Sequence, residues 1–90
     1  MDVERIKARI AELAESPKNV RFQEIERLLE NHIRHLYGNY NHHQSSSHHA
    51  FTVGSRTFTI TEPKSGALKV KYVKHFLEAM EELGLYERED

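Results

Sequence analysis

The chain's 90 residues carry 38% hydrophobic side chains, no cysteine and a formal net charge of −1 at pH 7. This length allows one domain with one modest core, and the missing cysteines exclude a disulfide framework, a thiolate zinc site and a cysteine nucleophile. No apolar run approaches the ~20 residues that a membrane-spanning helix needs, and residues 1–4 lack a basic-then-apolar leader, so we expect a soluble, cytoplasmic protein.

The two signs of charge are unevenly distributed along the chain. Residues 31–75 hold six basic side chains against one acidic one, Glu62, and they include all seven histidines, whereas residues 76–90 hold six acidic side chains against one basic one. Imidazoles that gain protons near pH 6.5 would add positive charge to this middle segment. The segment could therefore face a polyanion, or it could be a solvated surface beside acidic neighbours. Charge alone leaves both interpretations open.

Two amphipathic helices are predicted in the first third of the chain, over residues 2–15 and 21–31, with a break at residues 16–19. Apolar residues three or four positions apart mark them: Val3, Ile6, Ile10 and Leu13 in the first, and Phe22, Ile25, Leu28 and Leu29 in the second. The following segment is less regular. From Ile33, Leu36 and Tyr37 we expect a strand near residues 33–38, followed by a polar loop through Ser47.

A β-hairpin is predicted where two β-type runs, Ser47–Val53 and Arg56–Thr61, are joined by the turn residues Gly54 and Ser55. This turn pairs His48 with Thr61 and His49 with Ile60. Paired residues share a side of the sheet and successive residues alternate sides. The core side collects His49, Phe51, Val53, Phe58 and Ile60, and the other side collects His48, Ala50, Thr52, Thr57, Thr59 and Thr61.

A last amphipathic helix is predicted after a loop at residues 62–66 and ends at Gly84, a typical helix C-cap. Its apolar face is Val70, Val73, Phe76, Leu77, Met80 and Leu83. The fold class is therefore α+β. The last five elements form an α-β-β-β-α unit after an extra N-terminal helix, with a three-stranded antiparallel sheet covered by helices on one face and open on the other.

The hairpin register predicts that two adjacent histidines, His48 and His49, lie on opposite sides of the sheet and have different roles. His49 is expected to be a packed imidazole on the helix-covered side, with its polar atoms satisfied by backbone groups. His48 is expected on the open side among alanine and threonines, where a polymer could reach it and where an imidazole can transfer protons near neutral pH. Simple solvent exposure is the alternative interpretation of His48.

We expect no metal site. Zinc needs three or four ligands in fixed geometry. The pair His42 and His43 falls in the predicted loop, and the adjacent residues His48 and His49 point to opposite sides of a strand. The middle segment has only one carboxylate, which argues against a two-metal nuclease.

Several segments, taken in order, resemble the HicA family of toxins. They are residues 19–22, a helix that ends at residues 28–30, Ser47-His48-His49-Ala50-Phe51, Thr59-Ile60-Thr61, and Val70-Lys71-Tyr72-Val73-Lys74. The resemblance covers about residues 17–85 of what we take as a single HicA-like domain over residues 1–90. The chain departs from the family pattern at Ser46, where the family usually has glycine, and in a longer stretch before His48.

The resemblance implies a fold like the double-stranded-RNA-binding domain and a metal-independent mRNA interferase of a type II toxin–antitoxin system. It implies His48, the first residue of the His-His pair, as the catalytic residue, with no cofactor. The implied partners are mRNA and a cognate HicB-like antitoxin, with no membrane, and self-association is left open. The departures leave open whether this copy is active.

Three basic residues, Arg56, Lys71 and Lys74, are candidates for phosphate contacts. Ordinary solubilising charge is the alternative for the two lysines. Tyr72 could stack on a base, although packing is the favoured interpretation. A different class of function also remains open, a non-catalytic RNA-binding or interaction module on the same fold.

Overall fold

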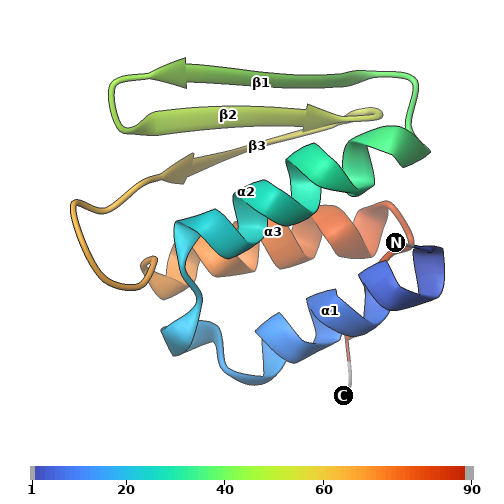
Figure 1. Ribbon diagram of the computed structural model, residues 1–90, viewed down its shortest axis with the longest axis horizontal. Coiled ribbons are helices and arrows are strands. Elements are labelled where there is room, and N and C mark those ends of the chain that lie inside the picture. The colour runs from blue at the N-terminus through green and yellow to red at the C-terminus, as the bar shows by residue number, and fades with distance from the viewer. Residues whose placement is uncertain (1, 89–90) are drawn as a thin grey trace.

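The computed structural model describes residues 2–88. Its elements are α1 (Val3–Glu15), α2 (Phe22–Asn31), β1 (Tyr40–Ser45), β2 (His48–Val53), β3 (Arg56–Thr61) and α3 (Val70–Glu82), with short 3-10 helices at Pro17–Asn19 and Ile33–Leu36. The strands form a three-stranded antiparallel sheet in the order β1-β2-β3 (Figure 1). The predicted α+β class and order of elements are confirmed.

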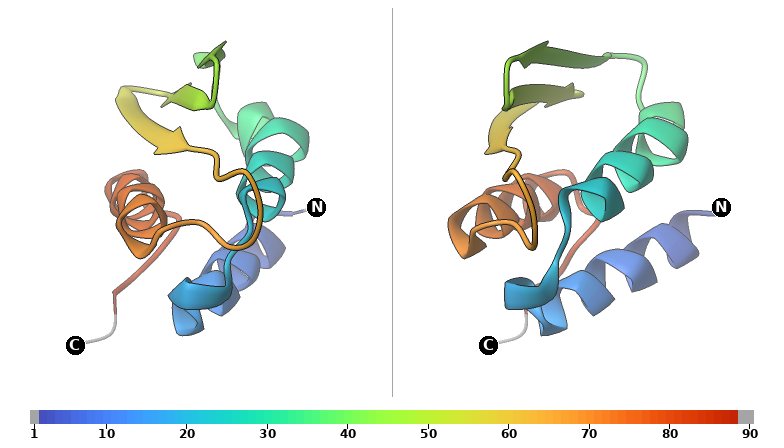
Figure 2. Two further views of the ribbon diagram at one scale, coloured as in Figure 1. Left: turned by 90° about the vertical axis from the view of Figure 1, so that its left-hand side faces the viewer. Right: turned by 60° about the vertical axis from the view of Figure 1, so that its left-hand side comes forward.

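The elements lie in three layers. Helices α2 and α3 cover one face of the sheet, and α1 lies on the far side of these two helices (Figures 1 and 2). The buried residues Ile6 and Ile10 of α1 have 0% of their surface exposed and belong to the same core cluster as Phe51 and Phe76. Helix α1 therefore packs on the hydrophobic core, and the folded unit includes residues that precede the segment 17–85.

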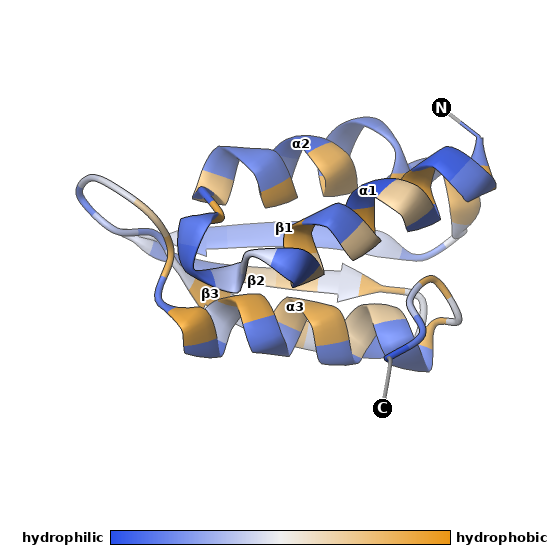
Figure 3. Ribbon diagram, turned by 90° about the horizontal axis from the view of Figure 1, so that it is seen from below, coloured by the Kyte–Doolittle hydropathy of each residue, from blue (hydrophilic) through white to orange (hydrophobic). Residues whose placement is uncertain are grey.

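The amphipathic pattern of the helices produces this packing. Hydrophobic residues of α3 gather on the side that faces the sheet, whereas β1 is hydrophilic (Figure 3). Val73, Phe76 and Met80 are fully buried along that side. Burial of apolar surface at about 25 cal/mol per Å² is the main stabilising contribution. No helix among residues 2–88 is long and apolar enough to span a bilayer.

The strand predicted near residues 33–38 is wrong. That segment begins with a 3-10 helix, Ile33–Leu36, which continues from the end of α2, and the strand β1 begins only at Tyr40. Ile33, Leu36 and Tyr37 are three or four positions apart, which is helical rather than alternating spacing. The segment predicted as a polar loop is the edge strand β1, most of whose residues are exposed. A strand that is polar on both sides gives no alternating hydrophobic signal.

The predicted hairpin register is confirmed at every pair, from His48 with Thr61 to Val53 with Arg56. Gly54 occupies the turn at φ +62°, in the left-handed region that glycine tolerates best. A second turn joins β1 to β2, where Ser45 pairs with His48. Here Ser46 adopts φ 58°, a conformation that is costly for a residue with a side chain. This is the position at which the HicA pattern usually has glycine.

Candidate functional site

One face of the sheet is left uncovered by the helices of residues 2–88 (Figure 1). This open face is hydroxyl-rich and carries two exposed imidazoles. The register assigns alternate residues of each strand to this open face: Asn41, His43 and Ser45 from β1, His48, Ala50 and Thr52 from β2, and Thr57, Thr59 and Thr61 from β3. None of these side chains is large and apolar. A polymer could therefore lie across the face without first displacing packed residues.

His48 lies at one end of the open face, as predicted, and its side chain is exposed. Its ring nitrogen Nδ1 is 3.1 Å from the hydroxyl oxygen of Thr61 on the neighbouring strand. This contact fixes the orientation of the ring. Among residues 2–88, no group hydrogen-bonds to the second nitrogen, Nε2, which is left for a ligand.

Thr61 also lies close to Tyr72 in the first turn of α3. The neighbouring Thr61 hydroxyl, and less strongly the charge of Lys71, lower the pKa of the Tyr72 hydroxyl, whereas desolvation raises it. The ammonium of Lys71 lies 5.0 Å from the centre of the Tyr72 ring. The phenol and the cation are therefore at the same end of the sheet as His48.

The other two basic candidates are not brought to His48. Arg56 is at the opposite end of β3, about 17 Å away at ~3.4 Å per residue. Its Nε atom lies 2.8 Å from Oε2 of Glu82 on α3, on the helix-covered side. Lys74 lies beside Tyr86 and Arg88, around a cavity of about 320 Å³.

His43 is a site candidate that the sequence did not reveal. It pairs with Ala50, two residues along β2 from His48, so the two exposed imidazoles are diagonal neighbours on one face. Such neighbours have Cα atoms about 7–8 Å apart. The misplacement of β1 hid this pair, and only recognition of residues 46–47 as a turn could have revealed it.

The opposite side of the same strands carries a second histidine pair. His49 is only 2% exposed, which confirms its predicted burial. Its polar partners are side chains rather than the expected backbone groups: Nδ1 lies 2.8 Å from Nε2 of His42, and Nε2 lies 2.9 Å from Oε1 of Glu62. The outer nitrogen of His42, Nδ1, contacts the carboxylate of Glu30. His42 belongs to strand β1, so the prediction that it lies in a loop is wrong.

Comparison with protein-family models, with curated proteins and with solved structures finds no match to this chain. The resemblance to HicA toxins therefore rests on the sequence motifs alone. The order of helices and strands agrees with a double-stranded-RNA-binding domain, but the likeness to that domain is otherwise a prediction.

Proposed function

We propose that this chain is a metal-independent endoribonuclease that cuts mRNA on the open face of its sheet, as the toxin of a type II toxin–antitoxin system in the cytoplasm. The observation that carries this proposal is the exposed imidazole of His48, oriented by Thr61 on an uncovered, hydroxyl-rich face. The HicA-like motif indicates the same residue independently, since the hairpin register uses no knowledge of the family.

RNA can be cut without a metal because its own 2′-hydroxyl can attack the adjacent phosphorus. A base removes the 2′-proton, the new bond from the 2′-oxygen to phosphorus forms, and the bond from phosphorus to the 5′-oxygen breaks. An acid then gives the leaving 5′-oxygen a proton, which yields a 2′,3′-cyclic phosphate and a free 5′-hydroxyl. Each proton transfer contributes about 10²–10⁴-fold to the rate.

His48 and His43 can divide these two proton transfers. Their rings extend from adjacent strands on the same side, and a phosphodiester can lie between diagonal neighbours of this spacing. If Thr61 accepts a hydrogen bond from Nδ1 of His48, Nε2 carries the lone pair and His48 is the base. His43 then protonates the leaving oxygen.

Lys71 is the basic residue best situated to stabilise the charge of the reacting phosphate. Its neighbour Tyr72 lies close to Thr61, the residue that His48 contacts, whereas Arg56 is already paired with Glu82. Contacts of Lys74 and Arg56 with more distant phosphates of the RNA are still predictions. A HicB-like antitoxin with acidic residues would neutralise the toxin by covering the open face.

Incubation of purified protein with RNA in excess EDTA tests the proposal. We expect fragments that end in 2′,3′-cyclic phosphate, and we expect His48→Ala to abolish them while His35→Ala, an exposed imidazole outside the face, preserves them. Intact RNA with a mobility shift would overturn the proposal in favour of the non-catalytic RNA-binding module. Cleavage that EDTA abolishes would overturn the metal-free mechanism.

A further inference from the structure

We propose that Glu26, His42 and His49 bind a divalent transition-metal ion, with zinc as the best fit, between the sheet and α2. The site is on the helix-covered side of the strands and does not depend on the proposed RNA cleavage.

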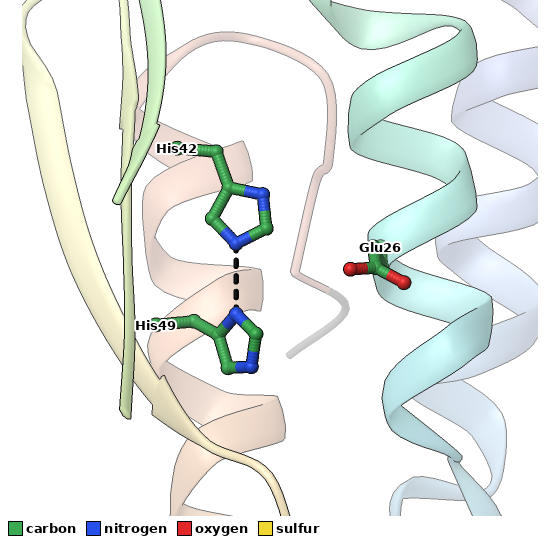
Figure 4. A group of neighbouring side chains, drawn as sticks. All are labelled: Glu26, His42 and His49. Atoms are coloured by element: carbon green, nitrogen blue, oxygen red, sulfur yellow. Dashed lines mark hydrogen bonds between the residues drawn. The ribbon is translucent and has the colours of Figure 1, made fainter. Parts of the chain in front are cut away.

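The three side chains converge from three elements. His42 comes from β1 and His49 from β2, while Glu26 comes from α2, and its carboxylate faces the two rings (Figure 4). One ligand atom from each residue lies within 4.8 Å of the other two. Three ligands of the His₂Glu type, with a fourth position for water, are a set that zinc uses in proteins.

The two rings are held rigidly in this arrangement by the aromatic core. The ring centres of His42 and Phe51 are 4.2 Å apart, and those of His49 and Phe22 are 4.3 Å apart. The side chains of His42 and His49 are 16% and 2% exposed. Ligands that are already ordered lose little conformational entropy when an ion binds.

The outer nitrogens have the partners that metal-bound histidines usually have. A ligating imidazole generally donates its second N–H to a carboxylate, which fixes the tautomer and the ring orientation. Glu30 lies at Nδ1 of His42, and Glu62 lies 2.9 Å from Nε2 of His49. This leaves Nε2 of His42 and Nδ1 of His49, the two nitrogens that face each other, to bind the ion.

A count of hydrogens leaves room at this cluster for one further cation, either a proton or a metal ion. The contacts from Glu30 to His42, from His42 to His49 and from His49 to Glu62 need one hydrogen each, three in total. Two neutral imidazoles carry only two. A metal ion between the rings replaces the central hydrogen, so that both outer N–H groups can donate to the carboxylates.

To accept zinc, the two facing nitrogens must move slightly apart, and the Glu26 carboxylate, whose ligand atom lies within 4.8 Å of them, must come closer. The facing nitrogens are 2.8 Å apart. Tetrahedral ligands at ~2.0–2.1 Å from zinc are about 3.3 Å apart. Imidazole donors favour zinc, copper or nickel, whereas magnesium and calcium prefer oxygen ligands throughout.

The test is a titration of EDTA-stripped and desalted full-length protein with zinc chloride. We expect one zinc per chain by elemental analysis, and a rise in Tm of about 5 °C or more when free zinc exceeds Kd about 100-fold. Magnesium chloride should leave Tm unchanged. Cobalt(II) should give the intense visible absorption of tetrahedral coordination.

The matched variants use neighbours on opposite faces. Glu26→Gln, on the partly exposed surface of α2, should lower zinc affinity at least tenfold without unfolding the protein, and His42→Asn should abolish stoichiometric binding. His43→Asn, on the open face, should bind one zinc as the wild type does. Folded wild-type protein that binds no zinc, or unchanged binding in Glu26→Gln and His42→Asn, would overturn the proposal. RNA cleavage in EDTA does not depend on either result, so the two proposals can fail separately.

Discussion

The two faces of the sheet place the same residue type in opposite environments. His42 and His49 are enclosed with carboxylates under α2, whereas their sequence neighbours His43 and His48 are exposed on the open face. Alternation along a strand separates them, because successive side chains point to opposite sides. The comparison teaches that two adjacent histidines in a strand occupy opposite environments, one buried and one exposed.

The largest expected effect is on stability, from the covered face. His49→Ala should lower the free energy of unfolding by about 3 kcal/mol, because it leaves a cavity and removes the partner of His42 and Glu62. Urea denaturation measures the change, with His48→Ala as the control that should stay within about 0.5 kcal/mol of wild type. Equal losses in both variants would contradict the assignment of faces.

A smaller effect, on rate, is expected from the second imidazole of the open face. His43→Ala should slow RNA cleavage about 100-fold, since it removes one of the two proton transfers. Single-turnover assays over a range of pH measure it, and loss of one limb of the pH–rate profile would identify its role. Unchanged cleavage would leave the second proton transfer to another group.

The turn between the two histidine strands should become more stable when its strained residue is replaced. Ser46→Gly removes the cost of φ 58° but increases the freedom of the unfolded chain, so we expect a net gain of about 0.5–1 kcal/mol. Thermal unfolding should show Tm higher by about 2–8 °C. A lower Tm would mean that the Ser46 conformation carries no strain.

The smallest effect is expected at the far end of the hairpin. The Arg56–Glu82 ion pair is partly exposed, so Arg56→Ala should lower the free energy of unfolding by at most about 0.5 kcal/mol. Urea denaturation with Glu82→Ala as the matched variant checks this value. A loss of RNA binding in Arg56→Ala alone would extend the RNA surface to this end of the sheet.

Sequence reasoning succeeded where hydrophobic periodicity is strong. The β2–β3 register followed from one glycine-containing turn and an alternating core, and it assigned His48 and His49 to the correct faces. The same register already pairs Arg56 with Val53, a core-side residue, so the distance of Arg56 from His48 could have been predicted.

The rest was hidden in β1, whose residues are polar on both sides. Because the strand was not predicted, the sequence could not show that His43 lies on the open face or that His42 lies beside His49. The positions of Glu26, Glu30 and Glu62 around His42 and His49 depend on how α2 and the loop after β3 pack against the sheet, which no local pattern encodes.

The proposed function depends above all on proton transfer by the exposed imidazole of His48 during metal-free RNA cleavage. The most direct test is the single-turnover cleavage rate in EDTA of His48→Ala, compared with wild type at equal folded fraction. We expect a rate at least about 100-fold lower, with an unfolding curve that superimposes on that of the wild type. A rate equal to that of the wild type would contradict it.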